Sequence, residues 1–219
     1  MKGTFVTFEG IEGSGKSTQI VLLANTLKTT GLHVVLTREP GGTPIGDQVR
    51  KILLDPANAG LDPSAELLLY AASRAQHLHE VIVPALAQGA IVLCDRFSDA
   101  TLAYQGYGRG LDIEKIRTLD RLVTAGMRPD LTVLFDIDAA SGLARAQGRN
   151  SSRGLAAEAR FENEALAFHE RVRQGYLTLT RQEPERIRVV DATPGPEDVQ
   201  RSVWAVVAEH LSRGNKKKN

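Results

Sequence analysis

The chain has 219 residues, of which 42% are hydrophobic and 24% are charged, and its formal net charge is +1. This length and composition favour one large globular domain, and the near-neutral charge gives no indication of a nucleic-acid-binding protein. Because no run of about 18 apolar residues occurs and the amino-terminal residues lack the apolar core of a signal peptide, we expect a cytoplasmic protein without a membrane span.

Short apolar runs alternate with longer helical patterns along the first quarter of the chain. The first strand is predicted at residues 4–8 and is followed, after a glycine-rich loop, by a helix at 17–29. A second strand at 32–37 leads through a loop rich in glycine and proline into a helix at 45–54. This alternation is typical of a parallel sheet covered by helices.

A long helix and a fully apolar strand are expected in the middle of the chain. The helix is predicted at 64–87, with Ser64 as a candidate N-cap and Pro84 as a candidate kink in its last turn. The strand at 90–94 contains the only cysteine, Cys94, so the chain has no internal disulfide. A lone cysteine in an apolar run indicates a buried thiol and fits a reducing compartment.

Helices and a fourth strand follow that apolar strand. Helical patterns cover residues 98–104 and 112–125, and an apolar strand is predicted at 131–135. A further helix is expected at 139–147, after an acidic strand end. In a parallel sheet, polar residues that follow the strands all gather at one edge, where ligands bind.

The last third of the chain is read as a polar loop, two helices and a strand. The loop is predicted at 148–154, a long helix at 157–181, a fifth strand at 187–190 and a final helix at 196–212. The basic tail at 213–219 is expected to be a solvated end. Together the elements predict one α/β domain over residues 1–212, a five-stranded parallel sheet with helices on both faces.

Residues 10–17 give the strongest local signal, because they match the phosphate-binding pattern G-x-x-x-x-G-K-[S/T] between a strand and a helix. Glycines let backbone N–H groups turn toward phosphate oxygens, and the helix N-terminus adds positive potential. Lys16 is expected to reach the β- and γ-phosphates of ATP, and the Ser17 hydroxyl to hold Mg²⁺. The residues expected to bind the nucleotide here are Gly10, Ile11, Glu12, Gly13, Ser14, Gly15, Lys16, Ser17 and Thr18.

Asp95 and Arg96 stand at the end of an apolar strand, where a carboxylate commonly orients a metal or a reacting hydroxyl. We therefore assign Asp95, with Ser17, to Mg²⁺. The neighbouring Arg96 suits a phosphate or the charge that develops during phosphoryl transfer. A strand-end salt bridge is the alternative interpretation.

Three motifs in order carry a resemblance to a known family: EGIEGSGKST from residue 9, TREPGGT from residue 37 and DRFSDATLAYQGYGRG from residue 95. With ELLLYAASRAQH from residue 66 and RFENEALAFHERV from residue 160, the chain resembles bacterial thymidylate kinases over nearly its whole length. The resemblance implies a nucleoside monophosphate kinase fold and transfer of the γ-phosphoryl group of Mg·ATP to dTMP, giving dTDP and ADP for dTTP synthesis. It also implies direct transfer without a covalent enzyme intermediate, and a homodimer built on apolar faces within residues 64–87 and 112–125.

The resemblance also implies roles for individual residues of the acceptor site. Glu12 corresponds to a carboxylate near the sugar 3′-hydroxyl and the metal, and Arg38 to an arginine beside the acceptor phosphate. Tyr70 stands where the family has an aromatic ring, more often Phe, that stacks on thymine. Arg74 lies four residues later, on the same helix face, and resembles the family's thymine-contacting arginine.

A second group of acceptor residues lies in the ATLAYQG stretch. The resemblance assigns Thr101 and Gln105 to the edge of the base and Tyr104 to the deoxyribose. An amide both donates and accepts hydrogen bonds, so Gln105 suits the N3–H and carbonyl pattern of a pyrimidine. Plain packing remains the alternative for Tyr104.

The segment of about 145–160 resembles a mobile lid, and it holds several arginines while the phosphate loop holds none. We hypothesise that Arg149 or Arg153 moves onto the ATP phosphates, and that Arg145 flanks the adenine. The segment Ala159-Arg160-Phe161-Glu162 departs from the family's commoner pattern, in which an Asp precedes the arginine. A loop after the last strand is expected to complete the adenine pocket.

Two alternatives stay open from the sequence. A deoxynucleoside or cytidylate kinase would keep the phosphate loop and the Asp-Arg pair, but the REPGGT segment argues against it. A non-catalytic nucleotide-binding module is disfavoured by the joint presence of Lys16, Asp95, Arg96 and the lid arginines. The histidines, including His169, are interpreted as structural or surface residues.

Overall fold

Five parallel strands form the sheet, in the spatial order β2-β3-β1-β4-β5. The computed structural model describes residues 3–153 and 159–216, with side chains over 3–148 and 159–213. The strands are β1 (Thr4–Glu9), β2 (Val34–Arg38), β3 (Ile91–Asp95), β4 (Leu131–Asp136) and β5 (Ile187–Asp191). The predicted five-stranded parallel sheet is confirmed, and each predicted strand overlaps an observed one.

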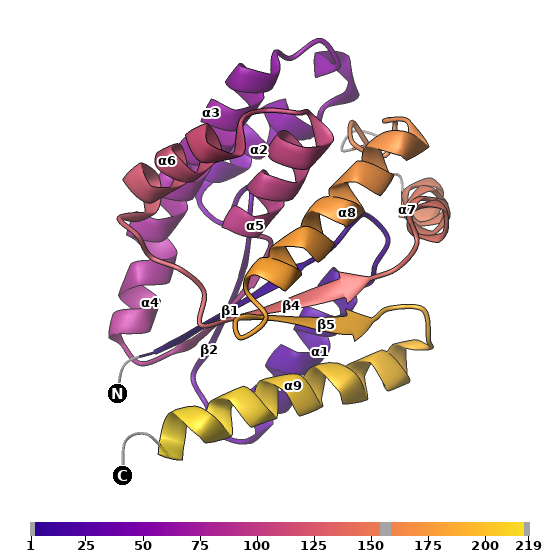
Figure 1. Ribbon diagram of the computed structural model, residues 1–219. Coiled ribbons are helices and arrows are strands. Elements are labelled where there is room, and N and C mark those ends of the chain that lie inside the picture. Colours follow the sequence, from indigo (N-terminus) through magenta and orange to yellow (C-terminus); the bar gives the residue numbers. More distant parts are fainter. Residues whose placement is uncertain (1–2, 154–158, 217–219) are drawn as a thin grey trace.

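Helices cover both faces of this sheet (Figure 1), as the sequence predicts. The helices α1 and α9 pack together below it, whereas α3, α5, α6 and α8 lie above it in the view of Figure 1. The α-helices are α1 (Lys16–Thr29), α2 (Pro44–Leu54), α3 (Pro63–His77), α4 (Val83–Ala87), α5 (Ser98–Thr101), α6 (Ile113–Thr124), α7 (Ala139–Arg153), α8 (Leu166–Gln182) and α9 (Pro196–Lys216). A 3₁₀ turn, η1 (Pro56–Asn58), and two π-helical segments, η2 (Leu78–Ile82) and η3 (Leu102–Gly108), complete the described elements.

The predicted helix at 64–87 differs from the structure at its start and in its middle. The N-cap is Asp62, not Ser64, because the Asp62 carboxylate accepts from the backbone N–H of Ser64 at 2.8 Å, and Pro63 occupies the first helical position. The helical path then widens into η2 before Pro84. Proline cannot donate to the carbonyl four residues earlier, and a π turn accommodates that loss.

The predictions around the lid were wrong in two places. Residues expected as a polar loop continue α7 to Arg153, and the helix expected from residue 157 begins only at Leu166. The second difference has a visible cause in Arg160. Its backbone N–H donates to Leu54 O at 3.2 Å, and its side chain is buried against α3. Arg160 is therefore held against α2 and α3, and the helix begins only after it.

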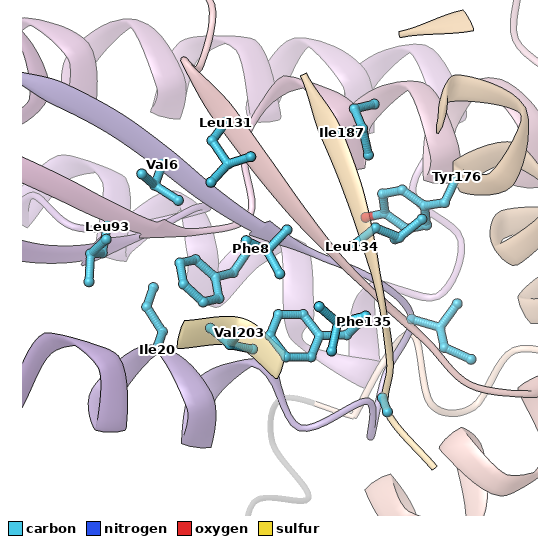
Figure 2. Packing of buried hydrophobic residues seen from close by; sticks show 14 of the residues in the cluster. Val6, Phe8, Ile20, Leu93, Leu131, Leu134, Phe135, Tyr176, Ile187 and Val203 are labelled. Carbon is cyan, nitrogen blue, oxygen red and sulfur yellow. The ribbon is translucent and has the colours of Figure 1, made fainter. Parts of the chain in front are cut away.

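The core lies on both faces of the sheet, as Figure 2 shows. Phe8 of β1 and Phe135 of β4 stack with ring centroids 5.8 Å apart, close to Ile20 of α1 and Val203 of α9. Leu134 points to the opposite side, toward Tyr176 of α8. Burial of such side chains, at roughly 1.5–3 kcal/mol each, holds the carboxyl ends of the central strands in a fixed relation.

Two further expectations concern Cys94 and membranes. The Cys94 thiol is fully buried and donates to Arg96 O at 3.0 Å, and burial raises its pKa well above the ordinary value. The predicted buried thiol is therefore confirmed. Over residues 3–153 and 159–216, no helix combines the length and the apolar character that crossing a bilayer requires.

Candidate active site

A cavity of about 1420 Å³ opens at the carboxyl ends of the strands. Parallel register brings Phe8, Arg38 and Asp95 to the same level of adjacent strands, so the residues that follow them meet at this edge. The predicted site residues that line the cavity are Glu12, Gly13, Gly15, Lys16, Ser17, Thr18, Arg38, Tyr70, Arg74, Asp95, Arg96, Thr101, Tyr104, Gln105 and Arg145. Gly10, Ile11 and Ser14 are buried behind that lining.

The phosphate loop owes its path to glycine. Gly15 caps α1 in a left-handed conformation with φ of 87°, and Gly13 has φ of 69°. A side-chain carbon at Gly13 would overlap the carbonyl oxygen of Gly142 in α7. The loop therefore lies directly against the backbone of α7, and no residue with a side chain fits at Gly13.

Lys16 is held inside the loop by oxygen atoms. It is 6% exposed, and its Nζ donates to Gly10 O at 3.0 Å, to Ile11 O at 2.7 Å and to Ser14 Oγ at 3.1 Å. Burial, and next the charge of Arg96, lower the pKa of Lys16 to about 7. An anion in the loop would reverse this effect, because a nearby negative charge favours the ammonium form.

Ser17 and Asp95 meet as the sequence predicts for a metal site. The Ser17 hydroxyl donates to Asp95 Oδ2 at 2.7 Å, across the gap between α1 and β3. A hydroxyl and a carboxylate are hard oxygen ligands of the kind that Mg²⁺ uses beside nucleotide phosphates. The described residues contain no group of three or more His, Cys, Asp or Glu that would hold a metal by itself.

Glu12 lies at the centre of a polar cluster. Its Oε1 accepts from Arg96 at 3.0 Å and from the Tyr104 hydroxyl at 2.6 Å, while His169 Nδ1 lies 3.3 Å from its Oε2. Burial alone would raise the pKa of Glu12, but the contact with His169 and the charge of Arg96 outweigh it and lower the pKa to about 2. Glu12 is therefore a carboxylate throughout the physiological range.

His169 was not singled out as a site residue from the sequence. It comes from α8, is 1% exposed and points its Nδ1 at Glu12. Its interpretation as a structural or surface histidine was incomplete, because the contact places it in the polar cluster around Glu12. The only available signal was its position within the RFENEALAFHERV stretch.

Arg96 is the most constrained cation of the cavity. Its φ is +70°, and its backbone N–H donates to Phe8 O at 3.0 Å, which fixes its direction out of β3. The guanidinium lies 4.8 Å from the Tyr104 ring centroid and donates to Gly10 O and to Tyr176. Such backbone strain at a site residue is typical of functional positions.

Glu9 is linked to that arginine through the Tyr176 hydroxyl and is a second residue missed by the sequence. It is fully buried and accepts from Phe97 N–H and from the Tyr176 hydroxyl, both at 2.7 Å. Burial, and next the charge of Asp99, raise the pKa of Glu9 to about 8. Glu9 therefore carries a proton at neutral pH, which leaves Arg96 available to other carboxylates and to ligands.

Arg74 and Thr101, both predicted to contact the acceptor base, are hydrogen-bonded to each other. Arg74 donates to Glu39 at 2.8 Å, to Thr101 Oγ1 at 2.9 Å and to Asp120 at 3.3 Å. These bonds occupy three of the five N–H donors of a guanidinium. Because the Thr101 oxygen accepts from Arg74, the hydroxyl hydrogen of Thr101 can be donated to another group, such as a ligand.

Tyr70 and Arg38 occupy different parts of the cavity. Tyr70 is half-buried against the core one helical turn before Arg74. Arg38, with a side chain 55% exposed, makes an ion pair with Asp47 at 3.3 Å. Arg38 therefore lines the cavity and also takes part in a surface salt bridge.

A buried carboxylate, Glu66 of α3, links Gln105 of η3 to Arg160. It accepts from Gln105 at 2.8 Å and from Arg160 at 2.5 Å. The sequence contains a signal for it, because Glu66, Tyr70 and Arg74 follow the i, i+4, i+8 spacing of one helix face. Arg160, counted among the lid arginines, is buried here at 3% exposure and does not face solvent.

The lid and adenine predictions are only partly covered by the described residues. Arg145 donates to Ala192 O at 2.9 Å and to Thr193 O at 3.2 Å, so α7 is attached to the loop after β5. This is the loop expected at the adenine. The side chains of Arg149 and Arg153 lie outside the described residues.

Comparisons with known proteins agree with one another. A family model described as thymidylate kinase matches residues 8–203. A thymidylate kinase of Trichlorobacter lovleyi is 59% identical over 95% of this chain and 98% of its own length, and one of Syntrophotalea carbinolica is 57% identical over 95% and 96%. The crystal structure of a thymidylate kinase from Ehrlichia chaffeensis, 37% identical, superposes with a TM-score of 0.75 and covers 95% of this chain and 99% of that one.

Proposed function

The chain belongs to the thymidylate kinase family and acts as a dTMP kinase, and from that premise we propose that it transfers the γ-phosphoryl group of Mg·ATP directly to dTMP in the cavity described above. The products are dTDP and ADP, on the route to dTTP. The supporting observation is that one cavity is lined both by the phosphate loop, the donor wall, and by Tyr70, Arg74 and Gln105, the acceptor wall. Arg96 contacts Gly10 of the first and Tyr104, next to Gln105, of the second.

ATP binds at the phosphate loop. Backbone N–H groups and the N-terminus of α1 surround its phosphates. The ammonium group of Lys16 exchanges the loop oxygens that it now contacts for β- and γ-phosphate oxygens. Adenine lies between Arg145 and the loop after β5, an assignment supported by the two hydrogen bonds of Arg145 to that loop.

Mg²⁺ is assigned to Ser17 and Asp95. The support is their 2.7 Å contact beside the phosphate loop and the hard oxygen character of both groups. When bound there, Mg²⁺ neutralises charge on the β- and γ-phosphates. The parallel register of β1, β2 and β3 keeps Asp95 level with Phe8 and Arg38, and so fixes its place at the edge of the cavity.

The acceptor lies against the opposite wall. Arg38 and Arg96 bind the phosphate of dTMP, and Glu12 lies near its 3′-hydroxyl. Tyr70 stacks on the base, while Arg74, Thr101 and Gln105 contact its edge and Tyr104 lies beside the deoxyribose. Burial and hydrogen bonding of Arg74, Tyr104 and Gln105 support these roles, because side chains held in advance bind a ligand with little loss of entropy.

Catalysis rests on positioning and electrostatics. No covalent enzyme intermediate is needed when donor and acceptor phosphates are held in line. Arg96, fixed by four partners and by its backbone, supplies a cation that does not reorganise as charge develops on the transferred group. Arg149 or Arg153 adds a second cation when the lid over about 145–160 closes.

Assembly and location complete the proposal. We place a homodimer interface on α3 and α6, supported by the exposed apolar side chains of Leu68 and Leu122 on these two helices, which pack together. A cytoplasmic location is supported by the buried, unpaired Cys94. Light scattering of the purified protein tests the dimer, and the Leu122→Glu variant should shift it to monomer.

A coupled ADP-release assay tests the activity. With saturating Mg·ATP, we expect strong turnover of dTMP, weaker turnover of dUMP, much weaker turnover of dCMP and none of thymidine. Preference for thymidine or dCMP would contradict the acceptor assignments of Tyr70, Arg74 and Gln105. For the lid, Arg149→Ala, Arg153→Ala and the double variant are assayed together, and an unchanged kcat in all three would rule out both arginines.

A further inference from the structure

Gln105 is held in one orientation by a buried carboxylate. Its Nε2 donates to Glu66 Oε1 at 2.8 Å, and the two residues are 1% and 0% exposed. A carboxylate that is paired with arginines only accepts hydrogen bonds, so the nitrogen end of the amide must face it. The oxygen end of Gln105 must then point the other way.

Two arginines fix Glu66 as that acceptor. Arg160 donates to its Oε2 at 2.5 Å, and Arg109 donates to both oxygens at 3.3 Å. A buried carboxylate without such partners would be strongly disfavoured. With them, its charge and its position are both set before any ligand arrives.

The free end of the amide faces the cavity. Gln105 lines the cavity together with Tyr70 and Thr101, and over residues 3–148 and 159–213 its Oε1 accepts no hydrogen bond. A ligand that covers this oxygen must supply a donor to it, because a polar atom cut off from water without a partner is costly. The site therefore presents a hydrogen-bond acceptor, not a donor, to the edge of the acceptor base.

We propose that Glu66 is a positioning residue that selects the acceptor base by fixing the amide of Gln105 with its oxygen toward the cavity. Thymine and uracil carry a hydrogen on N3 and can donate to that oxygen. Cytosine has a bare N3 lone pair, so two acceptors would face each other. The proposal rests on the acceptor site assigned above and adds the origin of its selectivity between pyrimidines.

Glu66→Gln is the variant that separates orientation from packing. Its side chain has the same size but one carbonyl oxygen and one NH₂ group. The carbonyl oxygen stays with Arg160, and the NH₂ group then faces Gln105. Two NH₂ groups cannot pair, so the amide of Gln105 turns over and presents its own NH₂ to the cavity, where it suits cytosine.

The measurement is kcat/KM for dTMP, dUMP and dCMP at saturating Mg·ATP. For Glu66→Gln we expect the value for dTMP to fall, that for dUMP to fall with it, and that for dCMP to rise, so that the dTMP/dCMP ratio drops about 100-fold or more. The matched control is Arg109→Met, which removes another partner of Glu66 without changing the amide. Its dTMP/dCMP ratio should stay that of the parent enzyme.

A parallel fall for all three substrates in Glu66→Gln, with an unchanged ratio, would overturn the proposal and leave Glu66 a structural residue. A fall of kcat/KM for dTMP without a fall for dUMP would also overturn the proposal, because both bases carry N3–H. If Glu66→Gln does not fold, Glu66→Gln/Arg109→Met removes the unbalanced charge, keeps Arg160 on the carbonyl oxygen and should show the same change of ratio. Failure of the parent enzyme to use dTMP would instead contradict the proposed function.

Discussion

The donor and acceptor walls of the cavity are built in different ways. The donor wall is one contiguous stretch, residues 10–18, and in the proposed role it offers ATP mainly backbone N–H groups, a helix terminus and Lys16. The acceptor wall gathers side chains from α3, η3 and the segment around Arg160, and buried ion pairs hold them. The first construction tolerates changes of side chain at several positions, whereas the second depends on the partners of each side chain.

Removal of Lys16, the one cationic side chain of the donor wall, should have the largest effect. We expect Lys16→Met to lower kcat by about 10²–10³-fold, the range for loss of one transition-state contact, with KM for dTMP nearly unchanged. Lys28→Met, on the exposed face of the same helix, is the control and should behave as the parent enzyme. A raised KM for dTMP with normal kcat would place Lys16 with the acceptor instead.

The acceptor wall should lose its function when one of its buried ion pairs is broken. Arg74→Lys keeps the charge but not the three-way contact with Glu39, Thr101 and Asp120, so we expect kcat/KM for dTMP to fall by about 100-fold. KM for ATP should not change. Arg121→Lys, exposed on α6, is the matched control. An equal loss for ATP would mean that the two walls do not act separately.

Glu9 is fully buried at the end of β1, and its effect should appear in stability. Its pKa of about 8 lies above the ordinary 4.5, so the folded state binds more protons than the unfolded state between those values. The free energy of unfolding should therefore fall as pH rises from about 5 to 8, by the order of a few kcal/mol. Glu9→Gln should remove that slope in urea titrations, and a slope that persists would contradict the protonated state.

His169 tests how the two walls meet at Glu12. Without it, the pKa of Glu12 should rise from about 2, because burial remains and one opposing contact is lost. We expect His169→Gln to move the acid limb of the kcat–pH profile to higher pH by about one pH unit. His79→Gln, an exposed histidine, is the control. An unmoved acid limb would show that His169 only fills space.

The same contrast explains what the sequence could predict. The phosphate loop, Ser17 and Asp95 were readable because each role depends on a local pattern or on a strand end, and the structure brings them together. Glu66, Glu9 and His169 were not found, because their roles arise from partners far away along the chain. No residue near Glu66 in the sequence indicates that its side chain contacts Arg160 and Gln105.

The errors of secondary structure have the same origin. Helical periodicity continues through residues 157–165, yet Arg160 is bonded to α2 and α3, and this tertiary contact overrides the local preference. In contrast, α7 extends past its predicted end although Gly148, Asn150 and two serines favour a loop. Strand positions were predicted well because parallel strands covered on both faces form nearly continuous apolar runs.

The close approach of Gly13 and Gly142 has a mechanical consequence. Because the two backbones are in contact and a packed interior is barely compressible, the phosphate loop cannot move toward α7 without displacing that helix. Arg145 attaches α7 in turn to Ala192 and Thr193, so a displacement of the phosphate loop is transmitted through α7 to the loop after β5.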